Sequence, residues 1–213
     1  MQVIELTHTI SEGMPVFPGD LPPELAAADS YEESGFRQAA LKIYTHTGTH
    51  IDPPAHVYPH GRTLDAFPAG QFAGSALVID CRGLPAGAEI TVDAIEAHGS
   101  AAREADFLLF NTGWDRLWGE EAYFRGYPCL GRGAIDLILS LGCKGIGLDT
   151  PGLDPVDDAA LTRHRLLLAG NIICIENLTN LGACPKWPFL FCCLPLKIAG
   201  SDGAPARAVA ITD

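Results

Sequence analysis

The segment HTGTHIDPPAH, residues 46–56, is the most informative stretch of the 213-residue sequence. It contains three of the seven histidines of the chain, together with Asp52 and two consecutive prolines. Imidazole nitrogens and carboxylate oxygens both bind Zn²⁺ or Mn²⁺ at about 2 Å, so this donor set is typical of an open metal site. The alternative is a polar surface loop, and the density of donors favours the metal site.

The spacing between His46 and Asp52 requires a bend in the chain. Gly48 and the Pro53–Pro54 pair argue against a helix here. In a straight strand, at about 3.3 Å per residue, His46 and Asp52 would lie about 20 Å apart, which is too far for one ion. Gly48 permits a bend. We therefore expect a strand that ends at Thr45, followed by a tight turn that carries the ligands.

Outside this segment, short apolar runs typical of strands alternate with segments whose apolar residues have helical spacing. This pattern predicts a mixed α/β fold. A loop dense in proline and glycine, MPVFPGDLPPE, covers residues 14–24. No linker, repeat or low-complexity tract interrupts the chain, so residues 1–213 are expected to form a single domain. The expected strands are 3–10, 36–45, 75–80, 107–110, 145–148, 172–175, 194–198 and 208–211, and the expected helices are 92–98, 131–141 and 161–169.

Composition excludes several classes of function. Lys and Arg number 14 against 26 Asp and Glu, for a net charge of −12, and no basic cluster is present, so nucleic acid is not an expected partner. No run of about 20 apolar residues predicts a membrane span, and the N-terminus does not resemble a signal peptide. Seven cysteines without a CxxC motif favour buried thiols in a reducing cytoplasm.

HTGTHIDPPAH resembles the HxGTHxDxPxH signature of the cyclase-like metal-dependent hydrolases, the family of bacterial kynurenine formamidases (arylformamidases) and isatin hydrolases. The resemblance covers nearly the whole chain and implies a swivelling β/β/α architecture, in which a barrel-like mixed sheet is flanked by helices. Further stretches resemble the family in the same order: MPVFPGD (14–20), NTGWD (111–115), GLDTPGLD (147–154), HRLLLAGNIICIENLTNL (164–181) and PLKIAGSDGAPARAVA (195–210).

The resemblance also implies a site for one or two divalent cations, with Zn²⁺ as the first expectation and Mn²⁺ as the alternative. His46, His50 and Asp52 are similar to the ligands of a first ion. Asp52 would bridge to a second ion, held also by His164 and Glu176. Mixed nitrogen and oxygen ligands accept both metals, so the sequence does not choose between them.

Glu176 has some support from its own position. It follows the apolar run IICI, and a carboxylate at the end of a buried strand is costly unless a charge or metal pairs with it. Pairing with Arg163 or Arg165 is the alternative. Asp149 also follows an apolar strand, where it either orients a ligand or caps a turn.

The resemblance assigns His56 as the catalytic histidine. Phe17 is the candidate substrate-binding residue, and Trp114, Trp187 and Phe189 are further aromatic side chains that either line a pocket or pack in the core. Relatives often carry Ser in place of Gly152 and Arg in place of Asn111, which are departures expected to affect the pocket.

The expected function is metal-dependent hydrolysis of an aryl formamide such as N-formylkynurenine, a reaction of tryptophan catabolism, to an arylamine and formate. A cation would activate water, and His56 would carry a proton to the leaving nitrogen. Two alternatives stay open: hydrolysis of a cyclic amide or lactone, as isatin hydrolase performs, and a non-catalytic metal-binding protein. The expected partners are a small aromatic amide and further copies of the chain in a homodimer or homotetramer, as the resemblance implies.

Overall fold

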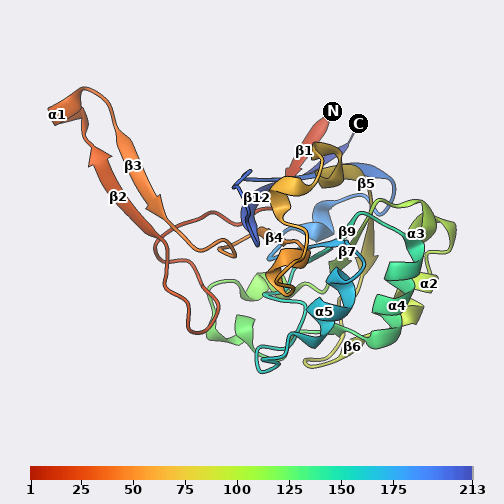
Figure 1. Cartoon of the computed structure of the whole chain (residues 1–213). Helices are drawn as coiled ribbons and strands as arrows, with labels where there is room; N and C mark the ends of the chain where they lie inside the picture. Colours follow the sequence, from red (N-terminus) through yellow and green to blue (C-terminus); the bar gives the residue numbers. More distant parts are fainter. Residues whose placement is uncertain (213) are drawn as a thin grey trace.

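The computed structural model describes residues 1–212. Its centre is an eight-stranded mixed sheet in the order β1-β12-β11-β5-β7-β9-β10-β4. Strand β4 also pairs with β12, so seven of these strands form a closed ring, which β1 extends at β12. Helices α2, α3, α4 and α5 lie together on one side of this ring (Figure 1). The expected fold class, a barrel-like mixed sheet flanked by helices, is confirmed.

The sheet consists of β1 (Gln2–Glu5), β4 (His50–Asp52), β5 (Ala73–Asp80), β7 (Phe107–Asn111), β9 (Gly145–Leu148), β10 (Ile173–Glu176), β11 (Phe189–Pro195) and β12 (Ala204–Thr212). Two further pairs are β2 (Glu24–Asp29) with β3 (Gln38–Lys42), and β6 (Glu89–Ile90) with β8 (Cys129–Leu130). The α-helices are α1 (Tyr31–Ser34), α2 (Val92–Glu96), α3 (Ser100–Glu104), α4 (Arg132–Leu141) and α5 (Thr162–Leu168). Short 3₁₀ helices cover Pro54–His56, Leu64–Ala66, Ala69–Phe72, Trp114–Leu117, Glu121–Phe124 and Leu181–Ala183. Among the described residues, no helix combines the length and the apolar character that a membrane span requires.

The central strands are apolar on both faces because each face is buried. On β5, Ala76 and Val78 belong to the core inside the ring, whereas Leu77 and Ile79 belong to the core beneath the helices. Successive side chains of a strand point to opposite faces, so a strand buried on both sides reads as a continuous apolar run. This is why the apolar runs SALVID (75–80) and FLLF (107–110) were expected to form strands.

Small side chains keep the interior of the ring filled without overpacking. A Cβ atom at Gly147 would lie 2.5 Å from Leu178 Cδ1 and 2.7 Å from Leu109 Cδ2, so any larger residue there would force these leucine side chains to shift. Strand β12 presents four buried alanines at every second position toward the same core, at positions 204, 206, 208 and 210. Side chains rather than solvent therefore fill the ring, as is usual in small barrels.

The second expected strand, residues 36–45, is shorter than predicted and does not reach Thr45. Only Gln38–Lys42 is extended, and it pairs with β2 in a two-stranded hairpin instead of joining the main sheet. Helix α1 joins the two strands, and the hairpin projects away from the body as an arm (Figure 1). The apolar pattern predicted the extended backbone of β3 correctly. Its partner β2 was not predicted, because β2 begins at the end of the proline-rich loop, which has no pattern typical of a strand.

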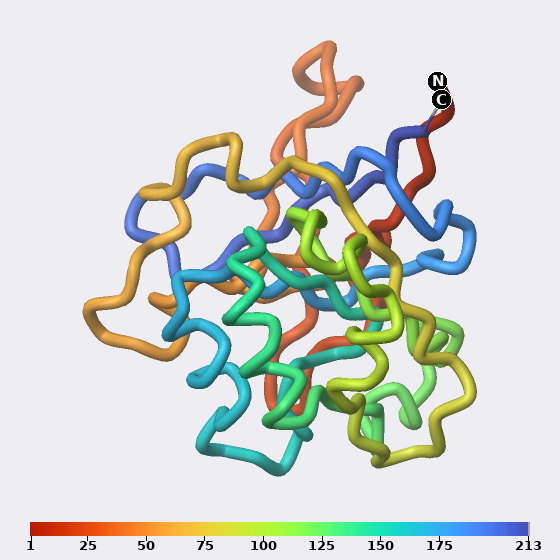
Figure 2. The backbone as a smooth tube through the Cα atoms, turned by 90° about the vertical axis from the view of Figure 1, so that its right-hand side faces the viewer, coloured from red at the N-terminus to blue at the C-terminus, as the bar shows by residue number. Residues whose placement is uncertain are grey.

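The last expected strands are also displaced. β11 covers Phe189–Pro195 rather than residues 194–198, and β12 begins four residues before 208. The two ends of the chain lie side by side in Figure 2, because β1 and β12 pair antiparallel with Gln2 opposite Thr212.

Candidate active site

Strands β4 and β10 bring acidic and imidazole side chains to one edge of the ring. The two strands pair antiparallel, with His50 opposite Glu176. His50 and Asp52 are two positions apart on β4, so their side chains project from the same face. His50 Nε2 lies 3.3 Å from Asp52 Oδ1 and 3.5 Å from Glu176 Oε2. Three candidate ligands, from segments far apart in the sequence, therefore meet here.

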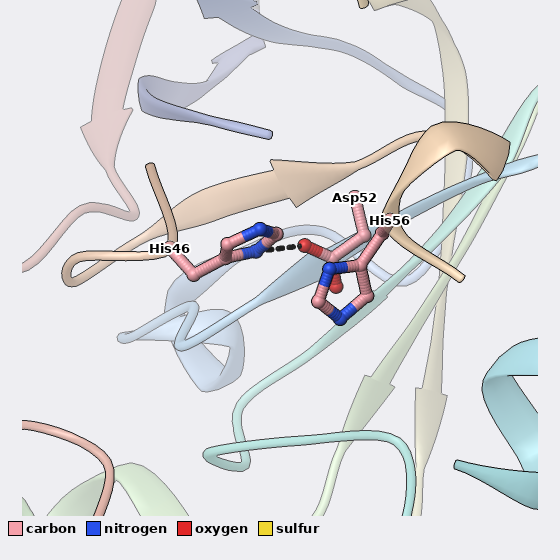
Figure 3. A group of neighbouring side chains, drawn as sticks. All are labelled: His46, Asp52 and His56. Carbon is pink, nitrogen blue, oxygen red and sulfur yellow. Dashed lines mark hydrogen bonds and ion pairs between the residues drawn. The ribbon is translucent and has the colours of Figure 1, made fainter. Parts of the chain in front are cut away.

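His46 reaches the same place from the loop before β4. Gly48 has a φ of +64°, in the left-handed region, and turns the chain back. His46 Nδ1 consequently lies 2.7 Å from Asp52 Oδ1 (Figure 3). The predicted bend at Gly48 is confirmed. The expectation that the turn carries all the ligands is wrong, because the chain resumes sheet pairing at once and puts His50 and Asp52 on β4.

His164 completes the group from helix α5. Its Nε2 atom lies 3.0 Å from Glu176 Oε1 and 3.5 Å from Asp52 Oδ2. The structure thus gathers all five side chains that were predicted as ligands. Possible ligand atoms lie within 4.8 Å of one another in two overlapping groups, one of His46, Asp52 and His56, the other of His50, Asp52 and Glu176.

Asp52 is the residue that the two groups share, and its surroundings fit a divalent cation. Its side chain is 1% exposed, and its Oδ2 atom accepts no hydrogen bond from the described residues. Burial opposes ionisation, but the adjacent His50, His46 and His56 hold the pKa of Asp52 well below its usual range. A buried, ionised carboxylate with an unsatisfied oxygen, surrounded by imidazole nitrogens, is a donor set that Zn²⁺ or Mn²⁺ accepts.

The carboxylates in turn favour positive charge on the neighbouring rings. Burial alone would lower the pKa of His46, but Asp52 and then Asp202 outweigh it and raise this pKa to about 9. Burial is outweighed likewise at His164, where Asp154, Asp52 and Glu176 raise the pKa well above its ordinary value. The cluster is therefore built to hold positive charge.

His56 borders the cluster from the 3₁₀ helix Pro54–His56, and its ring lies beside Asp52 in Figure 3. The ring centroid is 4.2 Å from that of His46 and 5.5 Å from that of His164. Burial, together with the charge of His46 and His164, lowers the pKa of His56 despite the opposing effect of Asp52. Within the described part of the chain, no hydrogen bond holds this ring.

The alternative for Glu176 is wrong. Its Oε1 atom accepts a hydrogen bond from Leu153 N, whereas Arg163 donates to the carbonyl of Leu130 and Arg165 to that of Val57. Arg163 also pairs with Asp154, with Nη1 3.7 Å from Oδ1, so neither arginine pairs with Glu176 in the described structure.

Asp149 holds a turn and contacts none of the candidate ligands in the described structure. It accepts hydrogen bonds from Thr112 N, Thr112 Oγ1 and Gly113 N. Burial nevertheless raises the pKa of this carboxyl group to about 7.

A cavity of about 410 Å³ opens beside the cluster. Phe17, from the proline-rich loop, lies in its wall as expected, and its ring meets that of Phe124 edge to face. Trp118, which stacks on His8 with ring centroids 3.8 Å apart, forms another part of the wall. No lysine or arginine is among the described residues that line the cavity.

Sequence reasoning missed Trp118 and Phe124. They lie in or beside short 3₁₀ helices, whose irregular spacing carries no periodic signal. The other aromatic candidates do not line the cavity: Trp114 belongs to a small core, and Trp187 and Phe189 pack against the two main cores.

The two departures from the family pattern differ in position. Gly152 lines the cavity, and a Cβ atom there would lie 3.2 Å from Tyr127 Oη and 3.8 Å from Glu176 Oε1. Asn111 is buried at the end of β7 and is not part of the wall. Of the two, only Gly152 affects the shape of the cavity directly.

Fold and site together define a class: a barrel-like α/β protein whose cavity carries a cluster of cation-binding side chains. The chain belongs to the Cyclase family, because the family model described as "Putative cyclase" matches residues 4–155. It is 30% identical over 213 residues to the kynurenine formamidase of Salinibacter ruber, covering 98% of this chain and 97% of that protein.

Solved structures show the same fold. Isatin hydrolase A from Labrenzia aggregata, bound to benzyl benzoate, is 25% identical with a TM-score of 0.87, over 98% of this chain and 93% of that one. A structure described as a potential metal-dependent hydrolase with cyclase activity is 27% identical with a TM-score of 0.79, over 100% and 99% of the two chains. The two named relatives are hydrolases, and the similarity covers 98% or more of this chain in all three comparisons.

Proposed function

We propose that this protein is a divalent-cation-dependent hydrolase that cleaves an aryl formamide, such as N-formylkynurenine, to an arylamine and formate. The observation that carries this proposal is the convergence of four further donor residues, His46, His50, His164 and Glu176, on the buried Asp52, whose Oδ2 atom accepts no hydrogen bond from the described residues. The 30% identity to a kynurenine formamidase supports the substrate class.

His46, His50 and Asp52 would hold one cation, and Asp52, His164 and Glu176 a second. Zn²⁺ suits this set best, and Mn²⁺ is the alternative. A bound divalent cation would polarise a carbonyl oxygen and lower the pKa of water toward about 7.

The protein's own part in the reaction is proton transfer and substrate orientation. The His56 imidazole takes a proton from the attacking water and delivers it to the amide nitrogen as the C–N bond breaks. Phe17, Trp118 and Phe124 provide flat apolar surfaces against which an aryl ring packs. The leaving amine departs neutral because His56 has protonated it.

A cyclic amide or lactone is the second candidate substrate, and the composition of the cavity wall favours it. No lysine or arginine lines the described cavity to pair with a substrate carboxylate, and a neutral ring such as that of isatin needs no such partner. Similarity to isatin hydrolase A adds support.

Stripping the purified protein with a chelator and restoring one cation at a time tests the proposal. We expect activity to return with Zn²⁺ or Mn²⁺. Comparison of kcat/KM for the two aryl formamides, N-formylkynurenine and formanilide, with kcat/KM for the cyclic amide isatin then distinguishes the two candidate substrate classes. A preference for isatin would favour the second candidate. A reloaded protein that is inert toward amides, esters and lactones would instead favour a non-catalytic cation-binding protein.

We also propose a homodimer or homotetramer in the cytoplasm. All seven cysteines are free thiols, which suits a reducing compartment. The arm formed by β2 and β3 is exposed on both faces and carries apolar residues, which suits contact with a second copy.

A further inference from the structure

Three of the clustered histidines have both ring nitrogens engaged. In each, one nitrogen faces Asp52 or Glu176, and the other contacts an oxygen outside the cluster. For His50 the outer contact is the carbonyl oxygen of Gly48, 2.7 Å from Nδ1. The outer contacts of the other two rings are carboxylates: Asp202 Oδ2, 3.3 Å from His46 Nε2, and Asp154 Oδ2, 2.7 Å from His164 Nδ1.

The two carboxylates differ in how firmly they are held. The Asp202 side chain is 53% exposed and belongs to a loop. Asp154 is 3% exposed and accepts hydrogen bonds from the main-chain N–H groups of Arg163 and His164. Asp154 is therefore fixed to the first turn of α5, the helix that carries the ring it contacts.

This arrangement determines which nitrogen of His164 keeps its proton when a cation is bound. An ionised carboxylate only accepts hydrogen bonds, so the nitrogen facing Asp154, Nδ1, must be the donor. Without a cation Nε2 also faces a carboxylate, Glu176 Oε1 at 3.0 Å, and carries a proton as well. A cation held beside Glu176 and Asp52 would replace that proton, while Asp154 keeps the proton on Nδ1. A carboxylate that fixes the tautomer and orientation of a ligating histidine in this way strengthens cation binding.

We propose that Asp154 is a positioning residue that fixes His164 in the tautomer and orientation required to ligate a cation. This inference rests on the cation site of the proposed function. It goes beyond that function because it assigns a role to a residue outside the ligand set. Asp202 has the same geometry toward His46 but, being exposed and more distant, acts more weakly.

The test measures cation affinity rather than turnover. Zn²⁺ is titrated into the chelator-stripped full-length protein in competition with a chromophoric chelator. We expect Asp154→Ala to raise the dissociation constant about 10- to 100-fold, Asp154→Asn to raise it less, and Asp202→Asn to raise it least. Asp158→Asn is the matched control, because Asp158 accepts hydrogen bonds from Ala160 N and Thr162 N at the same helix end without any contact to a histidine in the described structure.

A second measurement uses the unaltered protein, so it stands even where a variant fails to fold. In the zinc-loaded, ¹⁵N-labelled protein, we expect His164 to carry its proton on Nδ1. A proton on Nε2 instead, or a folded Asp154→Ala variant with unchanged affinity, would overturn the inference alone. If the wild-type protein fails to bind a stoichiometric amount of Zn²⁺, the proposed function is contradicted as well.

Discussion

His56 differs from the other histidines of the cavity in its contacts. The rings of His46, His50 and His164 are each held at both nitrogens, whereas no described hydrogen bond holds that of His56. A ligand benefits from being fixed, but a group that moves a proton must contact water first and the leaving group later. The contact pattern therefore separates the proposed proton carrier from the proposed ligands.

This difference makes a prediction about His56→Ala. The variant should retain its bound cation, measured by elemental analysis, while kcat falls about 10²- to 10⁴-fold because the proton carrier is lost. His60→Ala, at an exposed position in the next turn, serves as the control and should keep full activity. Loss of the cation from His56→Ala would make His56 a ligand, which its proximity to His46 and Asp52 also allows.

Asp149 predicts a pH dependence of stability. Burial raises its pKa to about 7 in the folded chain, against about 3.9 in the unfolded chain. Between these two values the folded state binds more protons than the unfolded state, so this group lowers the free energy of unfolding as pH rises, by up to about 1.4 kcal/mol per pH unit. Its contribution becomes constant above pH 7 and below pH 4.

Urea unfolding of the wild type and of Asp149→Asn, from pH 5 to 8, measures this effect. The asparagine does not titrate, so the stability of the variant relative to the wild type should increase with pH up to about pH 7. The lost hydrogen-bond acceptor adds a constant offset and no slope. A difference between the two proteins that does not vary with pH would contradict the prediction.

At the scale of elements, strand β9 illustrates how the filled ring constrains sequence. Gly147 faces the interior between Leu109 and Leu178, and a methyl group there would displace both leucine side chains. We expect Gly147→Ala to destabilise the protein by about 1–3 kcal/mol through overpacking, measured as a lower free energy of unfolding. Gly70→Ala is the control, since nothing lies within 4 Å of a Cβ atom there. Equal stability of the two variants would show that the core adjusts without cost.

At the scale of the whole molecule, the β2–β3 arm has no partner within the described chain. Its residues are almost all exposed, and Leu25 and Leu41 lie opposite each other across the hairpin. A two-stranded hairpin is marginally stable by itself in water. Contact of this apolar pair with another copy of the chain would stabilise it.

The arm therefore predicts the effect of a Leu25→Asp/Leu41→Asp double variant. Its molar mass in solution, measured by light scattering after size-exclusion chromatography, should be lower than that of the wild type. Leu84→Asp changes an exposed leucine on the body of the molecule and should leave the mass unaltered. A monomeric wild type would overturn the proposed oligomer, and an unchanged mass of the double variant would exclude the arm as its interface.

The amino-acid sequence alone was enough to predict the buried strands, the longer helices and the density of metal-binding side chains in residues 46–56. These features depend on local chemistry: strands buried on both faces must be apolar throughout, and Gly48 allows the turn that an extended chain cannot make. The bend at Gly48 and the strands around 75–80, 107–110 and 145–148 were accordingly predicted close to where they lie.

The meeting of distant segments, in contrast, is visible only in the folded molecule. The pairing of β4 with β10 puts His50 opposite Glu176, and the packing of α5 brings His164 to both. Tertiary packing also puts Trp118 in the cavity wall and brings the Asp154 carboxylate into contact with His164. Such contacts depend on sheet register and helix packing, which the whole core sets at once, so no local pattern contains them.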